Sequence, residues 1–215
     1  MTLQFGRLDF SEFALSRATF EFRYDHAYLL WDKTGNIWDA MKRKWPQIKA
    51  NKIEPNQQSF YWRPKGLMLQ IELTRAFVIT HNPGKSLEEF SQISADFESI
   101  IRNNLGLYEY SRLGFRPIFL RKYPNREAAS EHFLSTIDFH VPPSTVFNIE
   151  RGKPLEPEYS IRIEDDVTGV TVRLKVEGKK IDFEPPLDAD ELKEHHTESY
   201  SIALDIDFLR ANPLV

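Results

Sequence analysis

The stretch from Ser59 to Leu73 reads SFYWRPKGLMLQIEL and contains the pattern that decides the fold class. Its first five residues are rich in aromatic side chains, as strands are, and the PKG that follows is typical of a turn. From Leu67 onward, large aliphatic residues alternate with Met, Gln and Glu, which indicates a second strand with one buried face. The stretch therefore predicts a hairpin-like pair of antiparallel strands.

Helical signals follow this hairpin along the chain. Residues 76–79 form a short apolar run that either continues the second strand or forms a separate one. Ser86 and Glu89 then have the spacing of a capping box, and Gly106 is a suitable helix stop. Between them apolar residues recur at helical spacing, at Phe90, Ile93, Phe97, Ile100 and Ile101. We expect one long helix here.

The same two kinds of pattern precede the hairpin. Aromatic residues alternate with charged ones from Thr19 to Tyr24, which predicts a half-buried strand. Between Lys33 and Trp45 apolar residues return every four positions, which predicts a helix that Pro46 ends.

The remaining segments are mostly strands. Residues 107–120 are expected to form a long strand, and Asn125 to cap a short helix that ends near Ser135. Residues 159–163 and 170–176 flank a turn and predict a β-hairpin, and residues 200–208 a final strand.

Strands that occur singly and in hairpins, without regular β-α alternation, favour an α+β fold. We expect a mostly antiparallel sheet with helices on one face. The expected order is β-α-β-β-α-β-α, followed by a β-hairpin and a final strand. Residues 1–141 would form the α+β core, and residues 142–215 a β-rich C-terminal part that completes the same domain.

The composition excludes several classes of chemistry. The 215 residues include no cysteine, which removes disulfides, thiolate metal sites and cysteine nucleophiles. We find neither a secretory signal pattern nor a membrane-length apolar run, so we expect a cytoplasmic protein that does not enter a membrane. The net charge of -4 argues against a dedicated duplex-DNA binder. Residues 155–215 hold 15 acidic and 7 basic side chains, which indicates either a distinct binding surface or ordinary solvated faces.

Three short motifs carry a resemblance. They are residues 18–23 (ATFEFR), residues 112–116 (Arg112-Leu113-Gly114-Phe115-Arg116) and residues 204–207 (LDID). Their order and spacing resemble a sporadically distributed family of uncharacterised bacterial proteins, marked by an Arg-x-Gly-Leu-Arg-Tyr motif after a long helix. This chain departs from that motif at Phe115 and Pro117. The resemblance implies a bacterial origin and a single fold unit, and it implies no activity or functional residues.

The predicted strand after the long helix provides the first candidate ligand site. On a strand, Tyr108, Tyr110, Arg112 and Arg116 share one face. Guanidinium groups bind carboxylates or phosphates through paired hydrogen bonds, and aromatic rings stack on bases. The alternative is that these arginines pair with acidic residues on neighbouring strands and hold the sheet together.

A second candidate is the basic, aromatic segment from Met41 to Lys65, within which Trp62 and Arg63 lie. Cations that follow a backbone of phosphates, with rings that stack on bases, suit single-stranded nucleic acid. The alternative is a solvated helix end beside core aromatic residues.

One group of histidines and carboxylates is a candidate metal site. His195 and His196 lie between acidic segments that include Asp188 and the pair Asp205 and Asp207. Carboxylates on a solvent-facing strand edge, which prevent unwanted strand pairing, explain the last two as well. We predict no bound metal and no cofactor. The sequence has no nucleophile elbow and no glycine-rich phosphate loop, so we assign no catalytic residue.

Three functional hypotheses follow. The leading one is a non-enzymatic interaction module that binds another protein. The alternative is a module that binds single-stranded nucleic acid or a nucleotide with Tyr108, Tyr110, Arg112 and Arg116, helped by Trp62 and Arg63. A metal-dependent hydrolase or nuclease is the third.

Overall fold

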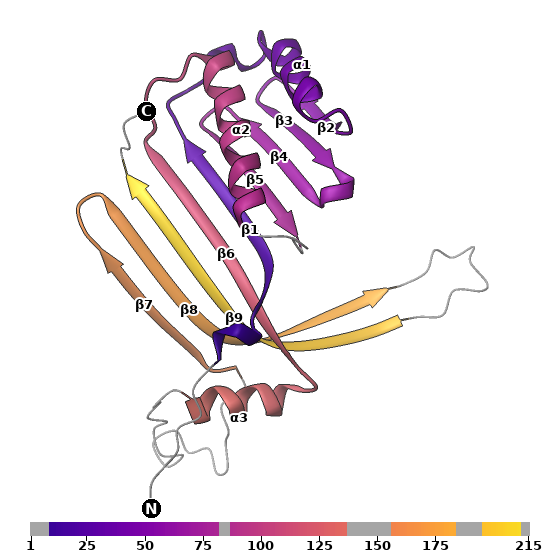
Figure 1. Ribbon diagram of the computed structural model, residues 1–215, viewed down its shortest axis with the longest axis vertical. Coiled ribbons are helices and arrows are strands. Elements are labelled where there is room, and N and C mark those ends of the chain that lie inside the picture. Colours follow the sequence, from indigo (N-terminus) through magenta and orange to yellow (C-terminus); the bar gives the residue numbers. More distant parts are fainter. Residues whose placement is uncertain (1–8, 82–86, 137–155, 184–194, 212–215) are drawn as a thin grey trace, which may run out of the picture. The chain divides into compact units, whose positions relative to one another are not determined.

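The computed structural model describes residues 9–81, 87–136, 156–183 and 195–211 (Figure 1). Within them, the helices are α1 (Thr34–Lys44), α2 (Leu87–Leu105) and α3 (Arg126–Thr136). The strands are β1 (Ala14–Arg23), β2 (Lys49–Glu54), β3 (Gln57–Trp62), β4 (Leu67–Glu72), β5 (Arg75–His81), β6 (Arg112–Tyr123), β7 (Glu158–Glu164), β8 (Thr168–Phe183) and β9 (His195–Ala211). None of the described helices is long and apolar enough to cross a membrane.

The described strands form one nine-stranded antiparallel sheet in the order β2-β3-β4-β5-β1-β6-β9-β8-β7. The hairpin predicted from the opening stretch is β3 and β4, and the turn between them ends at Gly66, which has a φ of 59°. The α+β class and the antiparallel sheet are therefore confirmed. The expectation that every helix covers the same face stays a prediction.

The sheet contains more strands than the sequence indicated. The apolar run at residues 76–79 belongs to β5, a separate strand that turns back against β4. β2 has the sequence KANKIE and was missed, because its residues are exposed on both faces and show no alternation of apolar and polar side chains. The strand expected over residues 107–120 begins only at Arg112.

The chain divides into two compact units, each built from separate segments. The first, which we call the larger unit, comprises residues 15–118, 161–172 and 205–215, and the smaller unit comprises residues 1–14, 119–160 and 173–204. The expected boundary at residues 141–142 and the expected cap at Ser86 fall outside the described residues.

The core of the larger unit joins α1 and α2 to the strands β1, β3, β4 and β5 (Figure 1). Phe22 of β1 lies opposite Ala76 of β5, and both are fully buried. The ring of Phe22 meets that of Phe97 from α2 edge-on, with 5.9 Å between ring centroids. The helical stripes predicted from the sequence supply the helix side of this core, so both helix predictions are confirmed.

The smaller unit has its own core, formed by α3 with parts of β8 and β9. Phe133 is fully buried there beside Val176 and Ile202. The predicted cap of α3 is confirmed, because the Asn125 carboxamide oxygen accepts a hydrogen bond of 2.8 Å from the backbone N–H of Ala128.

Candidate functional site

Two connecting segments of the larger unit line a cleft of about 640 Å³, which we call the aromatic cleft. Residues 24–29 belong to the connection between β1 and α1, and residues 105–111 join α2 to β6. The segments are held by backbone hydrogen bonds: the N–H of Ser111 donates to the carbonyl of Arg23 (2.9 Å) and that of Ala27 to the carbonyl of Leu73 (2.8 Å). Gly106, with a φ of 65°, ends α2 and redirects the chain into the cleft wall.

The floor of the aromatic cleft contains two buried tyrosines. The Tyr24 hydroxyl donates to the backbone carbonyl of Glu72 at 2.7 Å, and the Tyr110 hydroxyl donates to the carboxylate of Glu98. Burial raises the pKa of both phenols, and the carboxylate of Glu98 raises that of Tyr110 further. Both phenols therefore stay neutral, and their hydroxyl groups are committed to holding the floor in place.

The rim of the cleft is aromatic and open to solvent. Tyr28 is 81% exposed and Tyr108 is 84% exposed, although both are large aromatic residues. The ring of His26 stacks on Tyr28 with 5.5 Å between centroids and an angle of 21° between the planes. Close by in sequence, Leu29 and Trp31 are also exposed. Exposed groups of this kind mark interaction surfaces, because tyrosine and tryptophan are the residues that interfaces favour.

The charges that line the cleft have one sign. The exposed side chains of Asp25 and Glu109 both contribute to its wall, and no lysine or arginine among the described residues does. Within the described residues, neither carboxylate has an ion pair or a side-chain hydrogen bond. The cleft therefore combines aromatic rings with two carboxylates that are available to a cation.

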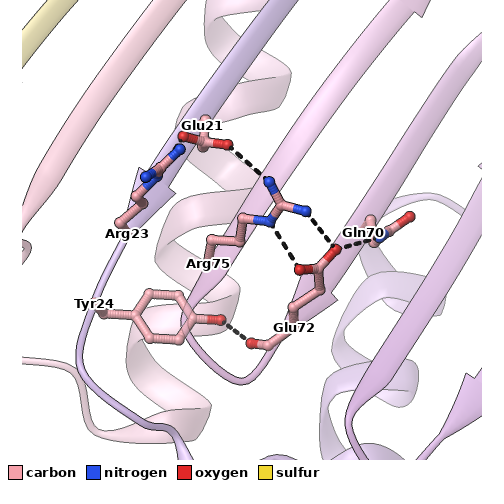
Figure 2. Close-up of polar contacts among 6 residues, drawn as sticks. All are labelled: Glu21, Arg23, Tyr24, Gln70, Glu72 and Arg75. Carbon is pink, nitrogen blue, oxygen red and sulfur yellow. Dashed lines mark hydrogen bonds and ion pairs between the residues drawn. The ribbon is translucent and has the colours of Figure 1, made fainter.

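A smaller cleft of about 420 Å³ adjoins the first and shares Tyr24 and Ser111 with it. Its arginines are already engaged, as Figure 2 shows. Arg75 donates to both carboxylate oxygens of Glu72, at 2.8 and 3.1 Å, and Arg23 donates to Glu21 at 2.7 Å. The hydrogen bonds from Arg75 hold the pKa of Glu72 below its usual value. This network fixes the strand end against which Tyr24 packs, and it is poorly suited to take up a further anion.

The structure corrects the shared face expected for Tyr108, Tyr110, Arg112 and Arg116. Because β6 begins at Arg112, the two tyrosines lie in the preceding connection, where alternation does not apply. Tyr108 points into solvent and Tyr110 into the core. The two tyrosines share the aromatic cleft, whose lining includes neither arginine.

Arg116 pairs with Asp205 of β9, as the alternative interpretation of the arginines proposed. Its guanidinium donates two hydrogen bonds to the carboxylate, at 2.8 and 2.6 Å. Asp205 is only 3% exposed, and β9 lies between β6 and β8 in the sheet. The interpretation of Asp205 as a solvent-facing edge residue was therefore wrong. Arg112 is partly buried, and its Nε has no hydrogen-bond partner within the described residues.

Trp62 and Arg63 lie at the end of β3 and the start of the following turn, and neither lines the aromatic cleft. The Trp62 ring lies beside that of Trp45, with 6.0 Å between centroids, and packs against the core. For Trp62 this agrees with the alternative of a core aromatic residue. The side chain of Arg63 is exposed.

The described residues hold no group of three or more side chains that could bind a metal ion. The acidic segment around Asp188 lies outside them, as do the side chains of His195 and His196.

Sequence reasoning missed one half of the aromatic cleft. It did not single out Asp25, His26 or Tyr28, because residues 25–31 (DHAYLLW) follow neither a helical nor a strand period. The available signal was an apolar, aromatic run without periodicity, between the predicted strand that ends at Tyr24 and the predicted helix that begins at Lys33.

No protein-family model matches the chain, and no curated protein is similar to it in sequence.

Proposed function

We propose that this chain is a protein-binding module whose aromatic cleft receives a lysine or arginine side chain from its partner. The observation that supports the proposal is the combination of two exposed tyrosines, Tyr28 and Tyr108, with the carboxylates of Asp25 and Glu109, which have no ion pair among the described residues. A folded protein gains nothing for its own stability by leaving two tyrosines more than four-fifths exposed. A partner that covers them would gain that apolar burial.

The electrostatics of the cleft favour a cation as its ligand. The face of an aromatic ring attracts a cation within about 6 Å, with about 0.5–1 kcal/mol at exposed sites and about 2 kcal/mol or more where water is excluded. Asp25 and Glu109 add charge-assisted hydrogen bonds to an ammonium or guanidinium group. The buried phenols of Tyr24 and Tyr110 supply a neutral floor that does not compete for the cation.

A phosphate or nucleic-acid backbone is a poorer match for this cleft. Both of its carboxylates repel phosphate, and Arg116, one of the two arginines predicted to bind an anion, is already paired with Asp205. None of the described residues that line the cleft is a lysine or arginine, so the contacts on which binding to phosphates depends are not present among them.

The proposal can be tested with defined peptides rather than with an unknown partner. A fluorescently labelled arginine-rich peptide is titrated with the full chain and binding is followed by fluorescence anisotropy, beside a glutamate-rich peptide of the same length. We expect the arginine peptide alone to bind, and the binding to weaken as salt screens the exposed carboxylates. The double variants Asp25→Asn/Glu109→Gln and Tyr28→Ala/Tyr108→Ala should each weaken it by about tenfold, which corresponds to about 1.4 kcal/mol.

Tyr61→Ala is the matched control, because Tyr61 is an exposed tyrosine of β3 that does not line the cleft. It should bind the arginine peptide as the wild type does. Equal binding of the acidic peptide, or full binding by both double variants, would contradict the proposal.

A further inference from the structure

The strand β7 forms one end of the described sheet, so one of its edges faces no other described strand. All seven of its residues are exposed. Three of them are large apolar side chains that alternate along the strand and therefore share one face: Tyr159, Ile161 and Ile163, with Ile163 68% exposed. An edge of this kind is a template for pairing with another strand.

The hydrogen-bond pattern shows which backbone groups are available at that edge. Pro157 accepts from Val176 of β8 at 3.0 Å, and Asp165 donates to Thr168 of β8 at 2.9 Å. Because backbone groups alternate in direction along a strand, the odd-numbered residues of β7 turn theirs toward β8. Glu158, Ser160 and Arg162 therefore direct their N–H and C=O groups to the open edge.

We infer that β7 pairs antiparallel with β7 of a second copy of this chain, in a register centred on Ser160. In that register Glu158 lies opposite Arg162 of the second copy, and the same ion pair forms a second time by symmetry. Tyr159 lies opposite Ile161 of the second copy, again twice. Opposite charges and aromatic–aliphatic pairs are the cross-strand combinations that stabilise a sheet.

Registers shifted toward the C-terminal end of β7 lack this complementarity. A register centred on Ile161 places Glu158 opposite Glu164 of the second copy, and one centred on Arg162 places two arginines face to face. The register centred on Ser160 pairs every residue from Glu158 to Arg162 without either repulsion inside that stretch, and it leaves Glu164 opposite Glu156 of the second copy, which lies outside β7. It also places the outward backbone groups of Ser160 opposite each other, as an antiparallel ladder requires.

Within a single chain, the contacts of Arg162 do not prevent it from changing partner to Glu158 of the second copy. It donates to Glu164 two positions along the same strand at 2.7 Å, and both side chains are more than half exposed. A pair so exposed is worth little in water, so Arg162 can turn to Glu158 of the second copy with little loss. The edge shares no residue with the aromatic cleft, so each proposal can fail without the other.

Sedimentation equilibrium of the full chain over a wide range of concentrations tests the inference. We expect a mass that rises from the 25.2 kDa monomer to twice that value. Arg162→Glu places like charges opposite each other at two positions and should weaken self-association by about tenfold or more. The double variant Glu158→Arg/Arg162→Glu restores both ion pairs in swapped order and should restore the dimer.

Lys52→Glu is the matched control, because it makes the same charge change at an exposed residue of β2, the strand at the opposite end of the sheet order. It should leave the dimer unchanged. Circular dichroism shows whether each variant is folded before its mass is compared. A monomer at every concentration, a dimer that resists Arg162→Glu, or a double variant that fails to restore self-association would overturn the inference.

Discussion

Replacement of Arg116 by alanine removes both hydrogen bonds that β6 donates to Asp205 of β9, which measure 2.8 and 2.6 Å. The carboxylate side of this pair is buried, with 4% of the Asp205 side chain exposed, whereas 42% of the Arg116 side chain is exposed. The two partners are separated by 89 positions in sequence. The pair therefore stabilises the folded chain without contributing to local structure.

The expected loss of stability depends on this difference in exposure between Arg116 and Asp205. A hydrogen bond to a charged group is worth about 1.5–3 kcal/mol, and two bonds to the same carboxylate are not additive. Because water reaches the guanidinium, we place the cost of Arg116→Ala at about 2–3 kcal/mol, below the cost of breaking a fully buried pair. For a chain of this length each kcal/mol lowers Tm by about 2–4 °C. Arg116→Lys keeps the charge but loses the two-pronged geometry, so it should cost about half as much.

Urea unfolding of Arg116→Ala, Asp205→Ala and the double variant measures the coupling between the two residues. We expect a coupling free energy of about 1.5–3 kcal/mol. Arg43→Ala is the control, because Arg43 pairs with Asp39 at 3.2 Å where both side chains are mostly exposed, and it should cost less than about 0.5 kcal/mol. A coupling near zero, with Arg116→Ala no more costly than the control, would refute the assignment of Arg116 to a structural role and return it to the candidate ligand-binding residues.

Four further outcomes are expected. The hydrogen bonds from Arg75 hold the pKa of Glu72 in the folded chain below the ordinary value of 4.5. The unfolded chain therefore takes up the proton first, and stability is lost as pH falls below 4.5. Glu72→Gln should flatten the acid side of a plot of unfolding free energy against pH. Burial, followed by the charge of Arg121, lowers the folded pKa of His132 below 6.5, so stability should fall as pH drops through 6.5, and His132→Gln should remove that dependence in thermal melts. Gly106→Ala forces a side chain into a φ of 65° and should cost about 1–2 kcal/mol in urea unfolding. Phe97→Ala empties a fully buried position and should cost about 3–5 kcal/mol in the same assay.

The elements that could be predicted from the sequence are those whose signals are local. The stripe that contains Phe97 and the stop at Gly106 belong to one helix, and every residue needed to recognise them lies within that helix or beside it. The same holds for the cap at Asn125. Side-chain periodicity, capping and glycine geometry act over a few residues, so they are visible without any tertiary structure.

The strands that sequence reasoning missed or misplaced lack such signals. β2 is exposed on both faces, and its place in the sheet comes from pairing with β3 and not from apolar side chains of its own. The start of β6 is set where Ser111 bonds to the backbone of Arg23, a residue distant in sequence. The sequence near β2 and near Ser111 does not indicate which distant segments they pair with, so sequence patterns could place neither β2 nor the start of β6.

The aromatic cleft shows the same limit at the level of function. Tyr108 and Tyr110 are two positions apart and have identical side chains, and yet Tyr110 is bound to Glu98 in the core while Tyr108 is 84% exposed. The segment of Tyr24 and Tyr28 divides in the same way. Which tyrosine is buried depends on α2 and on the strand ends around the cleft. Substitutions of the buried and of the exposed tyrosines therefore test different properties. Replacement of Tyr24 or Tyr110 tests the fold, whereas loss of Tyr28 and Tyr108 leaves the core intact and tests binding alone.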